Sequence, residues 1–196
     1  MAMTSVAAHH WTREEYERVV ETGAFEGWKI ELVEGVLHDM APKSTQHTGT
    51  VHKILGELRK VSSERPLDVH PQMPLAVSAD SLPEPDIAVV PEDPEGDCYS
   101  AHHPTTAVLV VEVADLSLQY DREVKAAIYA RAAIPEYWIV NLVARQLEIH
   151  REPTGDAFRS RSILGPSDQV SPLFAPDVSL PMTRLLPKEP RRGESV

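Results

Sequence analysis

The chain has 196 residues, 42% of them hydrophobic and 25% charged, which fits one soluble globular domain with a sizeable core. Its formal net charge of −11 argues against a broad metal-free surface for nucleic acid, because phosphate binding draws on clustered lysine and arginine. A nuclease is still compatible with this charge, since acids gathered at a metal site contribute to it.

Cysteine content and hydropathy indicate where the protein works. The single cysteine, Cys98, excludes a disulfide framework and a thiolate metal cluster, as expected in a reducing cytoplasm. We find no signal peptide, and no apolar run approaches the roughly 20 residues that span a bilayer. We therefore expect a cytoplasmic protein without membrane contact, with a single domain over 11–186 and flexible tails at 1–10 and 187–196.

The first part of the chain predicts helices and short strands. The run Thr12-Arg-Glu-Glu15 is a capping box, which predicts a helix from there to about Thr22. Turn residues and apolar spacing then predict strands at 29–33 and 36–39 about Glu34-Gly35, a helix capped by Ser44 or Thr45, and strands at 67–70 and 74–77.

Two apolar segments in the middle of the chain each carry an acid. Residues 107–113 read Ala-Val-Leu-Val-Val-Glu-Val, a continuous run typical of a strand covered on both faces. Burying the carboxylate of Glu112 there is costly unless a metal ion or a lysine compensates its charge. Asp86 stands at the mouth of a second apolar strand, 87–90, and Lys125 lies on the next predicted helix, 121–133. An exposed loop at 91–104, strands at 137–140 and 146–150, and a less regular segment around 158–164 complete the predicted order.

Each of these three residues also has an ordinary structural explanation. Asp86 can be a turn residue after a proline, and Glu112 can be a buried acid that pairs with an arginine such as Arg131. Lys125 follows Asp121 by four residues, the spacing of a solvated helical ion pair. As a group, however, two carboxylates and a lysine are the residue types that phosphodiester hydrolysis uses. Carboxylates hold a hard divalent ion, and a lysine orients water or offsets developing charge.

The same segments share a longer pattern with a known family. The pattern is Pro-Asp before a strand, Glu-Val within an apolar strand, a serine-bearing loop, Asp, Lys and Tyr on a helix, and a closing Pro-Glu-Tyr-Trp. In this chain it falls on Pro85-Asp86, Glu112-Val113, Ser117, Asp121, Lys125, Tyr129 and 135–138, with an N-terminal run at Glu31, Gly35, 40–42 and His47. This pattern resembles the Uma-two family of putative restriction endonucleases, a branch of the PD-(D/E)xK nuclease superfamily, over about 11–186.

The resemblance implies a restriction-endonuclease-like α/β fold, with a mixed central sheet flanked by helices. It also implies a DNA endonuclease that hydrolyses phosphodiester bonds with Mg²⁺ (or Mn²⁺). The residues it implicates are Asp86 and Glu112 as catalytic metal ligands, Lys125 as the catalytic lysine, and Glu31, His47 and Tyr129 as accessory groups. The wider superfamily usually places its lysine two residues after the strand acid, where this chain has Ala114. The assignment therefore depends on Lys125 supplying that charge from the helix.

A second function and an oligomeric state also follow from these observations. The alternative function is a catalytically inactive nuclease-fold module for binding or regulation, favoured by the acidic charge and by the lack of an evident DNA-recognition domain. We expect a homodimer, because cutting both strands of a duplex requires two sites related by two-fold symmetry. The helix from Thr12 and the hairpin about Gly35 are the expected interface.

Overall fold

The computed structural model describes residues 7–97 and 99–188, and a six-stranded mixed sheet forms its centre. The strands in spatial order are β3 (Leu67–Pro71), β4 (Ile87–Pro91), β5 (Leu109–Ala114), β6 (Glu136–Asn141), β7 (Gln146–Thr154) and β8 (Ala157–Leu164). Strands β5 and β6 run parallel, and the other neighbouring pairs are antiparallel. The predicted α/β class with a mixed central sheet is confirmed.

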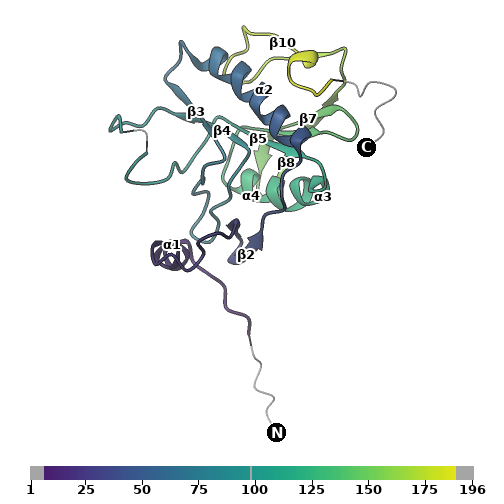
Figure 1. Ribbon diagram of the computed structural model, residues 1–196. Coiled ribbons are helices and arrows are strands. Elements are labelled where there is room, and N and C mark those ends of the chain that lie inside the picture. The colour runs from purple at the N-terminus through teal and green to yellow at the C-terminus, as the bar shows by residue number, and fades with distance from the viewer. Residues whose placement is uncertain (1–6, 98, 189–196) are drawn as a thin grey trace.

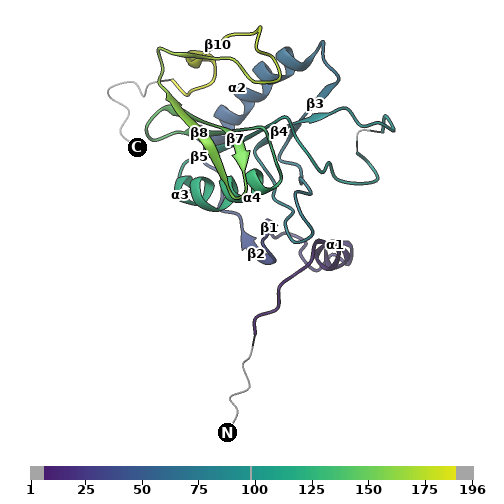
Figure 2. The ribbon, with the colours of Figure 1, turned by 180° about the vertical axis from the view of Figure 1, so that it is seen from behind.

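Helices cover both faces of this sheet (Figures 1 and 2). On one face lies α2 (Thr45–Ser62), joined by the C-terminal elements β9 (Gln169–Val170), β10 (Leu180–Pro181) and the 3-10 turn η2 (Met182–Arg184). On the other face, α3 (Leu118–Tyr120), the π-helical turn η1 (Asp121–Lys125) and α4 (Ala126–Arg131) follow one another without a break. None of the helices in the described part of the chain is long and apolar enough to cross a membrane.

Alternation along β5 decides which side chains meet which helix. Val111 and Val113 belong to the apolar cluster that includes α2, whereas Val110 and Ala114 belong to the cluster that includes α4. Because successive side chains of a strand point to opposite faces, Glu112 points toward the α4 side. Strand β5 thus supplies core residues to both layers and directs its one acid, Glu112, toward the α4 side.

The N-terminal elements form a smaller unit beside the α4 layer (Figure 1). It consists of α1 (Arg13–Glu21) and the hairpin β1 (Ile30–Val33) and β2 (Val36–Asp39), and its core contains Tyr16, Leu32, Ala76 and Leu82. The predicted capping box is confirmed, since the Glu15 N–H donates to Thr12 Oγ1 at 3.2 Å and the Thr12 N–H donates to Glu15 Oε2 at 2.9 Å. This cap starts the helix that covers the hairpin.

Three local predictions were wrong. Residues 74–77 form no strand, because their N–H groups bond to scattered carbonyls, including Leu75 to Pro83 and Ala76 to Pro104. The segment around 158–164 is the regular edge strand β8. The helical segment that carries Lys125 begins at Leu118, before Asp121. Residues 1–6 and 189–196, most of the predicted tails, lie outside the described residues, as does Cys98.

Candidate active site

The pairing of β4 with β5 brings the two predicted metal ligands side by side. The ladder pairs Ile87 with Val111, so the next antiparallel position places Asp86 opposite Glu112. The Asp86 N–H donates to Glu112 Oε2 at 3.2 Å, and the Val113 N–H donates to Asp86 Oδ2 at 2.9 Å. Each carboxyl group therefore accepts a hydrogen bond from the other strand, and the two acids form one buried pair.

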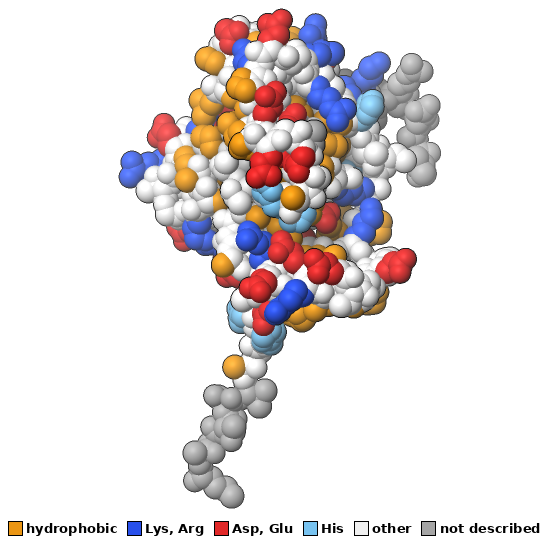
Figure 3. Space-filling view, turned by 90° about the vertical axis from the view of Figure 1, so that its left-hand side faces the viewer, with side chains coloured by type: hydrophobic (Ala, Val, Ile, Leu, Met, Phe, Trp, Pro, Cys, Tyr) orange, Lys and Arg blue, Asp and Glu red, His pale blue; other side chains and the backbone are white. Residues whose placement is uncertain are grey.

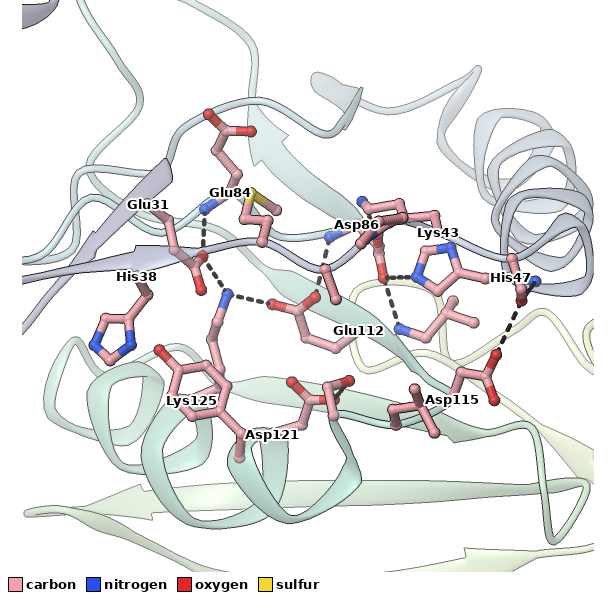
Figure 4. Close-up of a pocket in the computed structure, with 18 of the residues that line it drawn as sticks. Glu31, His38, Lys43, His47, Glu84, Asp86, Glu112, Asp115, Asp121 and Lys125 are labelled. Carbon is pink, nitrogen blue, oxygen red and sulfur yellow. Dashed lines mark hydrogen bonds and ion pairs between the residues drawn. The ribbon is translucent and has the colours of Figure 1, made fainter. Parts of the chain in front are cut away.

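Lys125 reaches this pair from η1, in the helical layer that Glu112 faces (Figure 4). Its Nζ donates to Glu31 Oε2 at 2.6 Å and to Glu112 Oε1 at 3.2 Å, and only 4% of Lys125 is exposed. Glu31 lies on β1, so the hairpin contributes a third acid. The ordinary explanations of Lys125 and of Glu112 are wrong: Lys125 is not a solvated partner of Asp121, and Arg131 pairs with Glu34 instead of Glu112.

The π-helical turn η1 places two ionisable groups on the pocket side of its helix. The Ala126 N–H donates to the carbonyl of Asp121, five residues earlier, which widens the turn. The side chain of Asp121 is buried and accepts a hydrogen bond from Ser117 Oγ at 2.6 Å. One turn later, in α4, the Tyr129 hydroxyl donates to Glu112 Oε1 at 2.9 Å. The helix therefore supplies Asp121, Lys125 and Tyr129 to the same site.

The outer side of Asp86 contacts two basic residues. Lys43 Nζ donates to Asp86 Oδ1 at 2.7 Å, and His47 Nε2 lies 2.9 Å from Asp86 Oδ2. Lys43 belongs to the segment between β2 and α2, whereas His47 lies in the first turn of α2. The N-cap Ser44 accepts from the His47 N–H at 3.1 Å, so the cap of α2 also fixes the position of the histidine.

Burial and clustering shift the protonation equilibria of these acids. Burial raises the pKa of Glu112 to about 8, because Lys125 offsets only part of the combined effect of burial and the neighbouring acids. Burial likewise raises the pKa of Asp121 to about 6, against the hydrogen bond from Ser117. Burial would also raise the pKa of Asp86, but His47 and Lys43 hold it below its ordinary value. At neutral pH the site therefore carries more acids than its lysines compensate, and Glu112 retains a proton.

Burial alone would lower the pKa of Lys125, but Glu112 and Glu31 raise it above its ordinary value. The lysine therefore stays positively charged in the site. It is suited to donate hydrogen bonds and to offset negative charge, and it is unsuited to accept a proton at neutral pH.

A cavity of about 290 Å³ opens over these groups, and Glu31, Asp86, Glu112, Asp121 and Lys125 all line its wall. We call it the acid pocket. On the face shown in Figure 3, acidic side chains lie among the basic ones, and the described residues there form no continuous basic stripe. The described residues of this face therefore offer little general attraction to a phosphate backbone.

The donor chemistry of the acid pocket fits a hard divalent cation with an incomplete protein shell. Within 7–97 and 99–188, no group of three or more His, Cys, Asp or Glu side chains is arranged to hold a metal ion. Mg²⁺, however, is usually bound through one or two carboxylates and keeps several waters. The adjacent carboxylates of Asp86 and Glu112 fit that requirement. They do not fit a closed tetrahedral zinc site.

The structure brings all six residues of the resemblance into contact with this site: Glu31, His47, Asp86, Glu112, Lys125 and Tyr129. Sequence reasoning missed Lys43 as a site residue and assigned Asp121 no role beyond the shared pattern. Lys43 lies inside the N-terminal run of that pattern, four residues before His47, and this proximity was the one available signal.

Comparisons with known proteins agree with this architecture. A family model, Uma2, with the description "Putative restriction endonuclease", matches residues 13–183. None of the curated proteins matches the chain. Among solved structures, the chain is similar to a crystal structure of a protein titled a putative nuclease belonging to DUF820, from Anabaena variabilis. The TM-score is 0.72 at 13% sequence identity, with 89% of this chain and 97% of that chain covered. A likeness at this identity shows a shared fold.

Proposed function

Because the chain belongs to the Uma2 family of putative restriction endonucleases, we propose that it is a metal-dependent endonuclease that hydrolyses phosphodiester bonds in DNA. Family membership supports a nuclease of the restriction-endonuclease type, and the cation, the substrate and the residue roles are our proposal. The observation that carries it is a single chain of contacts. Lys125 Nζ bonds to Glu112 Oε1, and Glu112 Oε2 accepts the N–H of Asp86.

In this proposal Asp86 and Glu112 are the ligands of Mg²⁺ (or Mn²⁺). A bound divalent cation would lower the pKa of a water and neutralise charge on the phosphate. Glu112 must lose its proton to become a ligand, and Lys125 stabilises the resulting carboxylate. The ammonium of Lys125 also provides a hydrogen-bond donor beside the reacting phosphate, where it offsets developing negative charge.

The accessory residues hold these groups in place. Glu31 accepts one N–H of Lys125 at 2.6 Å and so aims the ammonium toward Glu112. Tyr129 donates to Glu112 Oε1, which fixes the orientation of that carboxyl group. His47 contacts Asp86 Oδ2 from the capped end of α2. Side chains fixed in this way keep the reacting geometry without reorganisation.

The charge of the protein sets the expected order of binding. A net charge of −11 and an acid pocket without a cation repel a phosphate backbone. Cation binding reduces that repulsion at the place where the phosphate must approach. The cation therefore precedes DNA, and DNA affinity without a divalent cation is weak.

We further propose that the protein acts as a homodimer through its N-terminal unit. Val20 at the end of α1, Trp28 before β1 and Val36 on β2 are exposed large hydrophobic residues, and Trp28 is 65% exposed. A self-complementary interface there would bury this apolar surface and supply a second acid pocket for the second strand.

The test is cleavage of linear and supercoiled DNA with Mg²⁺, with Mn²⁺, and with EDTA. The wild-type protein should cut with either cation. Asp86→Asn keeps the shape of the side chain but removes a negatively charged ligand of the cation. It should lose at least about 99% of the rate, because the cation stabilises the transition state. Asp156→Asn, an equal charge change at an exposed turn residue, is the control and should cut normally.

A second candidate function is a catalytically inactive module that keeps the nuclease fold. It is favoured by the fact that both oxygens of Asp86 already have protein partners, Lys43 on one and His47 and Val113 on the other. Absence of cleavage on every DNA tested, with either cation, would support this module and contradict the endonuclease.

A further inference from the structure

Lys43 contacts one oxygen of Asp86, a residue that is a cation ligand in the proposed function. Its Nζ lies 2.7 Å from Asp86 Oδ1, whereas Oδ2 of the same carboxylate is held by the Val113 N–H and faces His47 Nε2. Lys43 therefore contacts Oδ1 of Asp86 and leaves Oδ2 to the other two groups. Because a ligand oxygen cannot serve an ammonium group and a metal ion in full at the same time, a cation that uses Oδ1 must displace Lys43.

The two lysines of the acid pocket are held very differently. Lys125 rises from a helix, bonds to two buried acids and has 5% of its side chain exposed. Lys43 extends from the connection between β2 and α2, bonds to one acid and has 18% of its side chain exposed. Removing Lys43 from Asp86 leaves the carboxylate with His47 and the Val113 N–H, so its departure does not leave a buried charge alone.

An alternative anion for Lys43 lies in the wall of an adjoining cavity. A second cavity, of about 480 Å³, shares Met40, Lys43 and Glu84 with the acid pocket. Within the described part of the chain the Glu84 carboxylate has no hydrogen bond or ion pair, and Figure 4 shows it pointing away from the acids. Glu84 is half-buried, so a cation beside it would stabilise its charged carboxylate.

We propose that Lys43 is a displaceable counterion that occupies the cation position at Asp86 in the metal-free protein and moves toward Glu84 when a divalent cation binds. This inference rests on the proposed metal-dependent function and adds a residue of the chain that regulates cation binding. Lys43 neutralises the charge of Asp86 until a divalent cation at sufficient concentration competes for that carboxylate. This contact stabilises the metal-free protein and weakens its affinity for the cation.

Titration calorimetry with Mn²⁺, without DNA, tests the displacement. We expect Lys43→Met to bind Mn²⁺ about tenfold more tightly than the wild-type protein, the scale of one charge-assisted hydrogen bond. Lys60→Met is the matched control, because this lysine is exposed and, among the described residues, its ammonium pairs with Glu57 alone; the affinity of this variant should equal that of the wild type. Glu84→Gln removes the alternative partner and should bind Mn²⁺ several-fold more weakly. A Lys43→Gln variant gives the same comparison if Lys43→Met does not fold.

The outcomes separate this inference from the proposed function. If the wild-type protein binds Mn²⁺ and both Lys43 variants bind it equally or more weakly, the displacement of Lys43 is overturned. The proposed metal-dependent nuclease activity is not affected by that result. An equal gain in Lys60→Met shows a general charge effect and also overturns it. Unchanged binding by Glu84→Gln overturns the move to Glu84. If no variant binds Mn²⁺, both the inference and the metal dependence fail.

Discussion

Glu112 should make cation binding strongly dependent on pH. Its pKa of about 8 in the metal-free protein means that only about one molecule in ten carries the ionised ligand at pH 7. Each pH unit below that pKa adds about 1.4 kcal/mol to the free energy of forming the ligand. The affinity for Mn²⁺ should therefore rise about tenfold per pH unit between pH 6.5 and 7.5 and level off above about pH 9.

Calorimetry in buffers of different ionisation enthalpy measures the same event directly. Binding at pH 7 should release about 0.9 proton per cation from Glu112, and the release should fall toward zero above pH 9. An affinity that is constant from pH 6.5 to 8, or binding without proton release at pH 7, would refute the assignment of Glu112 as a protonated ligand.

The stability of the metal-free protein provides the control, with a defined sign. The pKa of Glu112 is raised from 4.5 to about 8 on folding, so the folded state holds more protons than the unfolded state between those values. Stability should then decrease as pH rises through that window, because protons favour the folded state. Glu112→Gln, which resembles the protonated acid, should remove this part of the slope in urea titrations at pH 5 to 8 and remain close to the wild type in stability at pH 6.

Three further predictions concern the site and the assembly. Lys125→Met leaves the buried carboxylate of Glu31 without its cation and should lower the free energy of unfolding by about 3–5 kcal/mol in urea, an effect that the added change Glu31→Gln should reduce; a loss as small as that of a surface pair would contradict the buried contact. Tyr129→Phe removes the hydroxyl that donates to Glu112 Oε1 and should cost about 1 kcal/mol of stability and move the pH midpoint of Mn²⁺ binding upward; an unmoved midpoint would show that the hydroxyl does not stabilise the carboxylate. Light scattering should give the mass of two chains, and a monomer at high concentration with and without Mg²⁺ and DNA would exclude the homodimer.

The sequence predicted the parts of the site that local pattern determines. The apolar run 107–113 indicated a strand covered on both faces, and the acid within it identified Glu112 as a residue that needs a partner. The capping box predicted the start of α1. The resemblance then selected Lys125 from the helix, and the structure places it against Glu112.

Long-range register lay beyond local pattern. Strands β4 and β5 are both continuously apolar, so neither shows a period of two that would assign Asp86 and Glu112 to the same face. Their alignment appears only in the ladder that pairs Ile87 with Val111. The contact of Lys43 with Asp86 likewise joins residues 43 positions apart and depends on the path of the chain from β2 to α2.

The local errors have similar causes. Residues 74–77 have strand-like composition, but their N–H groups bond to loop carbonyls that only the folded chain brings near. The edge strand β8 consists of exposed and half-buried residues and lacks the apolar run that marks a central strand. The π-helical turn η1 differs from an α-helix by one hydrogen-bond step, which residue spacing does not reveal.

The most direct test of the central claim is anomalous diffraction from crystals of the protein soaked in Mn²⁺ near pH 8, where Glu112 ionises. We predict one strong peak in the acid pocket, with carboxylate oxygens of both Asp86 and Glu112 about 2.0–2.6 Å from the ion. Lys125 Nζ should remain beside Glu112. A well-occupied Mn²⁺ site elsewhere, with the acid pair still bonded as in the metal-free protein, would contradict the claim that these two acids form the cation site of a nuclease.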